Sequence, residues 1–407
     1  MKKTLILAAL VLVSAGCFAQ KKNVSKARNI VMAETEQAPD YDAARIAIDE
    51  ALRNEETMDQ AETYYVAGLI GYQENLWEHN HVSQDWTKRG KAVLECIGYW
   101  KKADEIAMTP TYDKKGKPHV QIRYRKMISD KMMDFYNNQE LIQYGVVLND
   151  NRDYKKAYEA FMTYLGIPDM PMMQDERLQA KMPKDSTYYL YKYYAARMAY
   201  DGEDLDLAIS MFRELMDGNH EPVHSGEFLY QSYINKGDSA MANQILDECI
   251  QKFPQEAWFL QNRINNLVNT GHADQAISYL DQAIAMDPQA QYYNSKGSIL
   301  NMLHRYDEAI PVLEQAAQLD PTNAGIQSNL GFVYFDHANQ MLEDATNLDM
   351  KAFNKVKAEA DKEFAKALPY FKKAYELESE NYQYRTALRQ LYYRLKMMDE
   401  YEKLGAY

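Results

Sequence analysis

The apolar positions of one stretch near the C-terminal end follow a helical spacing. In "HRYDEAIPVLEQAAQLDPTN", residues 304–323, Ala309, Leu313 and Ala316 fall at steps of four and three residues. This spacing places a small, a large and a small side chain on one face of an α-helix. Pro321 follows, where a helix has to end. The pattern predicts an amphipathic helix that packs closely through its small residues.

The same pattern returns towards the N-terminus at intervals of 33, 34 and 34 residues. Each copy has a small residue, then a large residue four positions on, then a third apolar residue three positions later. The copies are Ala276, Leu280 and Ala283; Ala242, Leu246 and Cys249; and Ala208, Phe212 and Leu215. A proline follows two of them, at Pro288 and Pro254. Such regular offsets predict an internal repeat.

A second helical pattern precedes several of these copies. It places a glycine between two larger residues, as in Tyr293-x2-Lys296-Gly297-x2-Leu300. The same spacing surrounds Gly331, Gly145 and Gly68. Each repeat is therefore predicted to be a pair of helices, and one pair alone cannot bury its apolar face, so the pairs have to stack.

These two patterns together resemble the tetratricopeptide repeat family, of an exported bacterial type. The family signature has an aromatic residue, Leu-Gly and Tyr in the first helix, and Ala, Phe and Pro in the second. The resemblance implies an all-α fold, an α-solenoid with the form of a right-handed superhelix. We expect about seven helix pairs followed by a C-terminal capping helix.

The departures from regular spacing set the predicted boundaries. Residues 1–19 form a signal peptide, residues 20–40 an N-terminal segment, and residues 41–407 one continuous solenoid. Within the solenoid we expect regular repeats over 187–321, extended pairs over about 61–110 and 324–378, and the capping helix over 382–404. A long helix is expected to lead into the segment that starts at Tyr154.

The leader "MKKTLILAALVLVSAGCFAQ" has a basic start, an apolar run and small residues, which is typical of a secretory signal peptide. Two cleavage sites fit. A general signal peptidase would cut before Gln20, whereas a lipobox ending at Cys17 would leave a lipidated N-terminus. The lipobox carries Ser14 where a large aliphatic residue is usual, so we favour a periplasmic protein over an outer-membrane lipoprotein. A membrane partner is expected only if Cys17 is lipidated.

Charge and composition exclude several classes of function. The net charge of −13 argues against a nucleic-acid partner, which requires a basic footprint. The basic cluster at Lys114, Lys115 and Lys117 is interpreted as a solvated loop. Cys96 and Cys249 occupy packing positions, and they lie too many repeats apart to form a disulfide.

No arrangement of side chains predicts catalysis, a cofactor or a metal. The pairs His79/His81 and His220/His224 lack further ligands at a recognisable spacing, and Met170, Met172 and Met173 are expected to fill gaps rather than bind copper. No phosphate loop, nucleophile elbow or HExxH motif occurs. We therefore expect a protein that is not an enzyme.

The resemblance also implies where a partner would bind. In tetratricopeptide arrays the first helix of each pair lines a concave groove that holds a partner segment. The positions that correspond to this groove are Tyr193, Arg197, Tyr200, Glu227, Gln231, Gln261, Asn265, Asn294, Ser298, Asn301 and Ser328. Their amides suit a peptide backbone, and the tyrosines offer apolar area with a polar tip. Arg197 stands nearly alone as a cation, so a clamp for a C-terminal carboxylate is not expected.

The predicted function is a non-catalytic scaffold of the bacterial cell envelope that binds another protein in this groove. The alternative is a lipid-anchored accessory subunit of an outer-membrane assembly or secretion machine.

Overall fold

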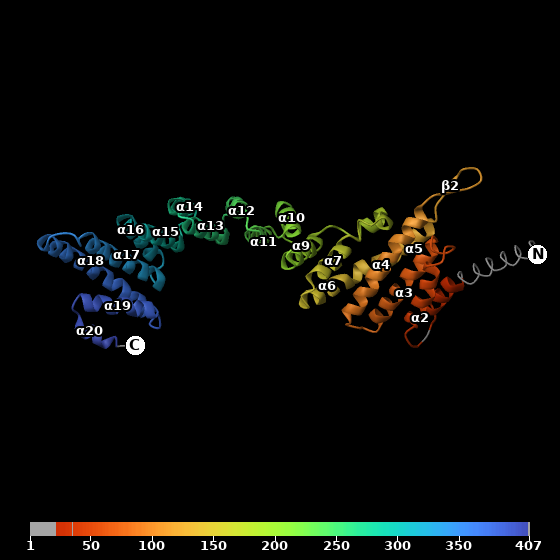
Figure 1. The fold of residues 1–407 in the computed structure, drawn as a ribbon, viewed down its shortest axis with the longest axis horizontal. Coiled ribbons are helices and arrows are strands. Elements are labelled where there is room, and N and C mark those ends of the chain that lie inside the picture. Colours follow the sequence, from red (N-terminus) through yellow and green to blue (C-terminus); the bar gives the residue numbers. More distant parts are fainter. Residues whose placement is uncertain (1–21, 35, 406–407) are drawn as a thin grey trace, which may run out of the picture. The chain divides into compact units, whose positions relative to one another are not determined.

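The computed structural model describes residues 22–34 and 36–405, so the leader and Cys17 lie outside the described residues. The described chain is almost entirely helical (Figure 1). It forms two compact units, Met1–Ile245 and Leu246–Tyr407, which are described separately here. The boundary between them falls inside helix α12 (Ser239–Lys252).

The first unit contains helices joined mainly by short turns, together with one small hairpin. Residues 22–31 are helical. The helices that follow are α2 (Tyr41–Leu52), α3 (Ala61–Asn80), α4 (Trp86–Met108), α5 (Ile122–Asn138), α6 (Glu140–Asp150), α7 (Tyr154–Leu165), α8 (Glu176–Gln179), α9 (Ser186–Asp201), α10 (Leu205–Asp217) and α11 (Pro222–Asn235), with a 3-10 turn η1 (Pro171–Met173). Strands β1 (Thr111–Tyr112) and β2 (Pro118–His119) pair antiparallel between α4 and α5.

The second unit consists of consecutive helix pairs. Its helices are α13 (Ala257–Asn269), α14 (Ala273–Met286), α15 (Ala290–Met302), α16 (Tyr306–Leu319), α17 (Ala324–Asp344), α18 (Met350–Leu377), α19 (Tyr382–Arg394) and α20 (Met398–Lys403). Each helix packs on its neighbour in sequence, and α15 also contacts α17. This is the stacking expected of an all-α repeat solenoid.

A close contact at the glycine explains why the first helix of a pair places a glycine between two larger residues. A Cβ atom added at Gly297 of α15 would lie 2.3 Å from Cγ of Leu313 in α16. At Gly331 of α17, the same atom would lie 2.7 Å from the ring of Phe371 in α18. Only glycine lets the two helices approach this closely. Ala309, Leu313 and Ala316 are fully buried, which confirms that they are packing residues.

The turns inside the pairs also repeat. The chain takes a left-handed conformation at the turn between the first and second helix, at Arg152, Glu203, Gly237, Gly271, His304 and Lys396. Lys396 explains a difference from the expected capping helix over 382–404. Its φ of 60° ends α19 and starts a short second helix, so the chain finishes with another pair, α19 and α20.

A second break lies between α5 and α6. The sequence predicts one long helix before Tyr154, but Gln139 adopts φ 57° and divides it in two. The two pairs with the longest helices are α3 with α4 and α17 with α18. Over residues 22–34 and 36–405, no helix is both long and apolar enough to cross a membrane.

Candidate partner-binding groove

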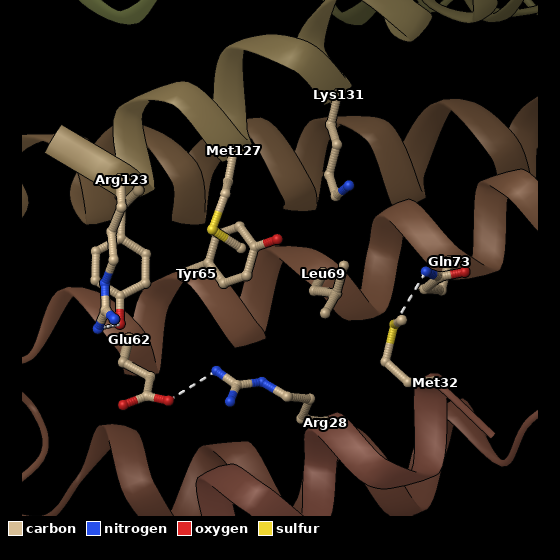
Figure 2. Close-up of a pocket in the computed structure, with 10 residues that line it drawn as sticks. Arg28, Met32, Glu62, Tyr65, Leu69, Gln73, Arg123, Met127 and Lys131 are labelled. Carbon is tan, nitrogen blue, oxygen red and sulfur yellow. Dashed lines mark hydrogen bonds and ion pairs between the residues drawn. The ribbon is translucent and has the colours of Figure 1, made fainter.

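A groove of about 480 Å³ lies on the first unit, between the helix of residues 22–31, α3 and α5 (Figure 2). Ten residues line it: Arg28, Met32, Glu62, Tyr65, Leu69, Gln73, Arg123, Tyr124, Met127 and Lys131. The groove therefore lies on three helices, of which α3 begins the pair with α4, and α5 precedes α6.

Helical spacing brings the lining residues to one side of each helix. On α3, Glu62, Tyr65, Leu69 and Gln73 follow at steps of three and four. On α5, Arg123, Met127 and Lys131 follow at steps of four. Residues at these steps share a helix face. Both faces are turned towards the same cavity, as Figure 2 shows.

The floor of the groove is apolar and firmly held. The Tyr65 ring stacks on the buried indole of Trp100, with centroids 6.3 Å apart, and also contacts the ring of Tyr124. The Trp100 indole N–H donates a 3.1 Å hydrogen bond to the Tyr65 carbonyl oxygen. Burial raises the pKa of the Tyr65 hydroxyl, which keeps it neutral. Met127 and Met32 remain 40% and 55% exposed and offer adaptable apolar surface above this floor.

Positive charge surrounds the floor. The Arg28 guanidinium pairs with Glu62 at 2.8 Å, so its charge is compensated. The Arg123 guanidinium lies 4.7 Å from the centroid of the Tyr124 ring, and the Lys131 ammonium lies 4.9 Å from that of Tyr72. Within the described residues, neither Arg123 nor Lys131 forms an ion pair with a carboxylate. Two cations are thus held over aromatic rings beside an apolar floor.

A buried polar network supports the α5 end of this region. Arg89 of α4 bonds to Glu140 at 3.1 Å and to the amide oxygen of Asn75 on α3. Asn75 in turn donates to Glu140. Both charged side chains are at most 5% exposed. Because Glu140 directly follows the break at Gln139, the network fixes the direction in which α6 leaves α5.

Several residues that the resemblance assigned to a groove in the first unit have partners within that unit. The Tyr193 ring is largely buried against Phe212 and Phe228. The Arg197 guanidinium lies 4.2 Å from the Phe228 ring centroid. The Tyr200 hydroxyl accepts a hydrogen bond from Asn235, which also accepts one from Gln231.

The assigned residues of the second unit are also engaged within the chain. The Gln261 amide donates to Asn265 on the same helix. The Asn329 amide donates to Asn294 at 2.8 Å and to Ser298 at 3.1 Å. The Asn301 amide donates to Asp336 at 2.8 Å. The bonds of Asn329 and Asn301 join α15 to α17, so part of the polar surface holds neighbouring first helices together.

Ser328 requires a correction. It is only 4% exposed, and its hydroxyl donates to the Gly325 carbonyl oxygen within α17. A partner therefore has no access to it in this structure. The spacing of the repeat put Ser328 on the groove face, but the longer α17 packs more of its circumference than α15 does.

The side chains considered for metal binding have structural partners instead. His81 stacks on Trp77, His220 stacks on Tyr189, and His79 contacts Arg89. The three methionines near residue 170 are buried in the core of the first unit. Across the part of the chain that the structure describes, no three His, Cys, Asp or Glu side chains form a group that could hold a metal ion.

The cysteines are buried as well. Cys96 and Cys249 are both 0% exposed. Burial raises the pKa of the Cys96 thiol well above its usual range, which makes it an inert packing residue.

The groove between α3 and α5 was missed at the sequence level, because α3 has apolar residues around most of its circumference and shows no clear amphipathic face. The available signal was on α5. The sequence "RYRKMISDKMM" repeats a cation, a methionine and a cation at steps of four, Arg123, Met127 and Lys131.

Comparison with known proteins gives one sequence match and several structural ones. Residues 262–324 match the sequence model of the tetratricopeptide repeat family. No curated protein matches the chain. A TPR repeats protein from Bacteroides fragilis NCTC 9343 has 17% identity, with 64% of this chain and 98% of that chain covered and a TM-score of 0.33. MamA 41-end from Desulfovibrio magneticus RS-1 has 20% identity, with 45% and 89% covered and a TM-score of 0.33.

Proposed function

We propose that this tetratricopeptide repeat protein is a non-catalytic scaffold of the bacterial cell envelope. It binds a segment of a partner protein in the groove between α3 and α5. The observation that carries this proposal is the pairing of an apolar floor with the cations Arg123 and Lys131, which have no carboxylate partner among the described residues. Apolar pockets with a few convergent charged groups are typical binding sites.

The chemistry of the groove selects one kind of segment. The floor at Tyr65 and Leu69 suits an apolar side chain of the partner, and Met127 can adapt to its shape. Arg123 and Lys131 suit carboxylates on either side of that apolar residue. The partner segment is therefore acidic and carries an apolar anchor.

Site-specific crosslinking in intact cells tests the groove. A photoreactive residue replaces Met127, which lines the groove, and a matched control replaces Met286, which is 66% exposed on α14 and lies outside it. We expect the residue at position 127 to capture a defined partner and the control not to. Equal capture at both positions, or capture at the control position alone, would reject the groove as the binding site.

The envelope location rests on the leader sequence, in particular on the apolar run that ends before Cys17. Cell fractionation tests it, with Cys17→Ser as the variant that separates the two processing routes. A protein that stays in the periplasmic fraction after this change is not anchored through Cys17. Retention of the protein in the cytoplasm would reject the envelope location itself.

A further inference from the structure

The hairpin between α4 and α5 has an ordered shape but is exposed along its whole length. All residues from 109 to 123 are exposed, and Figure 1 draws the hairpin extending beyond the helices around it. The connections inside the helix pairs, by contrast, are short turns. A two-stranded hairpin on its own is marginally stable in water, so this element gains little from its own fold and adds nothing to the core.

The tip of the hairpin is nevertheless well defined. Asp113 accepts hydrogen bonds from the backbone N–H groups of Lys115 and Lys117, at 2.8 Å and 2.9 Å. Gly116 takes a left-handed conformation with φ +76°, and its N–H donates to the Asp113 carbonyl oxygen. This turn presents Lys114, Lys115 and Lys117 together at the outermost end.

The strand pairing gives the hairpin two unlike faces. Tyr112 pairs with Pro118, and Thr111 pairs with His119. Cross-strand partners share a face, and successive residues alternate between faces. One face therefore carries Tyr112 and Pro118, while the other carries Thr111 and His119.

Exposed apolar side chains also occur at the base of the hairpin. Tyr112 is 70% exposed, Val120 is 41% exposed, and Ile122 at the start of α5 is 65% exposed. Large apolar side chains gathered at one exposed site are a sign of an interaction surface.

The charge of the hairpin is opposite to that of the whole protein. Residues 109–121, between α4 and α5, contain three lysines and one carboxylate, whereas the chain as a whole has a net charge of −13. An exposed tyrosine beside apolar residues, with lysines at the tip, is the composition that favours a negatively charged lipid–water interface. A protein partner would need a larger complementary area than fifteen residues offer.

We propose that this hairpin docks the protein on an anionic lipid surface, with Tyr112, Val120 and Ile122 entering the headgroup layer and the three lysines contacting lipid phosphates. The binding is peripheral and reversible, because only a few side chains enter the interface. It is independent of the groove, since Lys114, Lys115 and Lys117 do not line it.

Vesicle flotation tests the proposal on the chain from Gln20 onward, the predicted processed form, which keeps every described residue. The vesicles contain phosphatidylcholine alone or with about one third phosphatidylglycerol, because an anionic headgroup is the feature under test. Lys114→Glu with Lys115→Glu and Lys117→Glu should lower partitioning onto the anionic vesicles by about a hundredfold. Tyr112→Ser with Ile122→Ser should lower it by about tenfold.

The control variant reverses three exposed lysines of α18, Lys351, Lys355 and Lys373, and so changes the net charge equally. It should float as the parent protein does. The proposal is overturned if the parent protein does not float, if it floats equally with neutral vesicles, or if the hairpin and α18 variants behave alike. It is also overturned if a photoreactive residue at Tyr112 captures a protein while no vesicle binding occurs. Unchanged thermal melting of each variant keeps these outcomes interpretable.

Discussion

The leading helices of the two units use their polar side chains in different ways. In α15 and α17, Asn329 donates to Asn294 and Ser298, so the polar groups of one helix are bonded to those of the next. In α3 and α5, the cations Arg123 and Lys131 lie over tyrosine rings and have no carboxylate partner among residues 22–34 and 36–405. The first arrangement holds helices together, and the second leaves charge available to another molecule.

This difference matters for how repeat proteins are interpreted. A polar residue on a leading helix is a candidate partner contact only when neighbouring helices do not already use its hydrogen-bonding groups. Asn294, Ser298 and Asn301 do not meet this condition, whereas Arg123 and Lys131 do. The predictions that follow test the comparison from the largest expected effect to the smallest.

The buried ion pair between α4 and α6 should give the largest effect on stability. Arg89→Met removes the partner of Glu140 and leaves a buried carboxylate uncompensated. We expect the free energy of unfolding of the first unit to fall by about 3–5 kcal/mol, measured by urea denaturation. The control is Arg305→Met, because the ion pairs of Arg305 with Asp274 and Glu308 are exposed and contribute little. Equal losses in the two variants would contradict this explanation.

Charge reversal in the groove should affect binding and leave folding unchanged. Arg123→Glu with Lys131→Glu should weaken binding of the captured partner by about a hundredfold, because two favourable contacts become repulsive. Isothermal titration calorimetry with the purified partner measures the loss of affinity. The matched control is Lys351→Glu with Lys355→Glu, which makes the same charge change on α18. Unaltered affinity in the groove variant would show that the cations do not contact the partner.

Removal of the amide link between α15 and α17 should lower stability and leave partner binding unchanged. Asn329→Ala deletes two hydrogen bonds and should lower the free energy of unfolding by about 1–2 kcal/mol. Asn294→Ala alone should cost less, because Asn329 keeps its bond to Ser298. Neither change should affect the partner that the groove binds. A loss of partner binding at unchanged stability would show that these residues contact the partner.

The repeat itself could be predicted from the sequence because its signal is geometric. A small residue opposite a large one, as with Gly297 and Leu313, is needed wherever two helices pack closely, so the same spacing recurs in each copy. The turns were less predictable. Lys396 adopts a left-handed conformation that its residue type does not favour, so the break between α19 and α20 has no clear sequence signal.

The candidate site was harder to predict for a different reason. The helices around the groove are arranged by the break at Gln139, which divides α5 from α6, and by a buried network from three helices, α3, α4 and α6. Such contacts join residues more than fifty positions apart, as in Arg89 and Glu140, and spacing within one helix carries no record of them. The cation and methionine spacing on α5 was the one local signal.

The smallest predicted effect concerns Asp336, the α17 partner of Asn301. Burial raises the pKa of Asp336, although the bond from Asn301 opposes this shift. The folded state therefore binds the proton more tightly than the unfolded state, and the penalty on stability appears as the pH rises through the folded pKa. The Asn301 side-chain oxygen is buried without a hydrogen-bond donor.

Asp336→Asn removes the charged form and places an amide N–H group beside Asn301. We expect it to raise the free energy of unfolding of the second unit at neutral pH by about 1 kcal/mol. The gain should shrink as the pH falls towards the pKa of an unfolded aspartate, because the parent carboxyl then becomes neutral as well. Urea denaturation of both proteins at several pH values measures the gap. A stability difference between the two proteins that is independent of pH would show that burial of the charge is not its cause. The hydrogen bonding between residues 301 and 336 would then account for it.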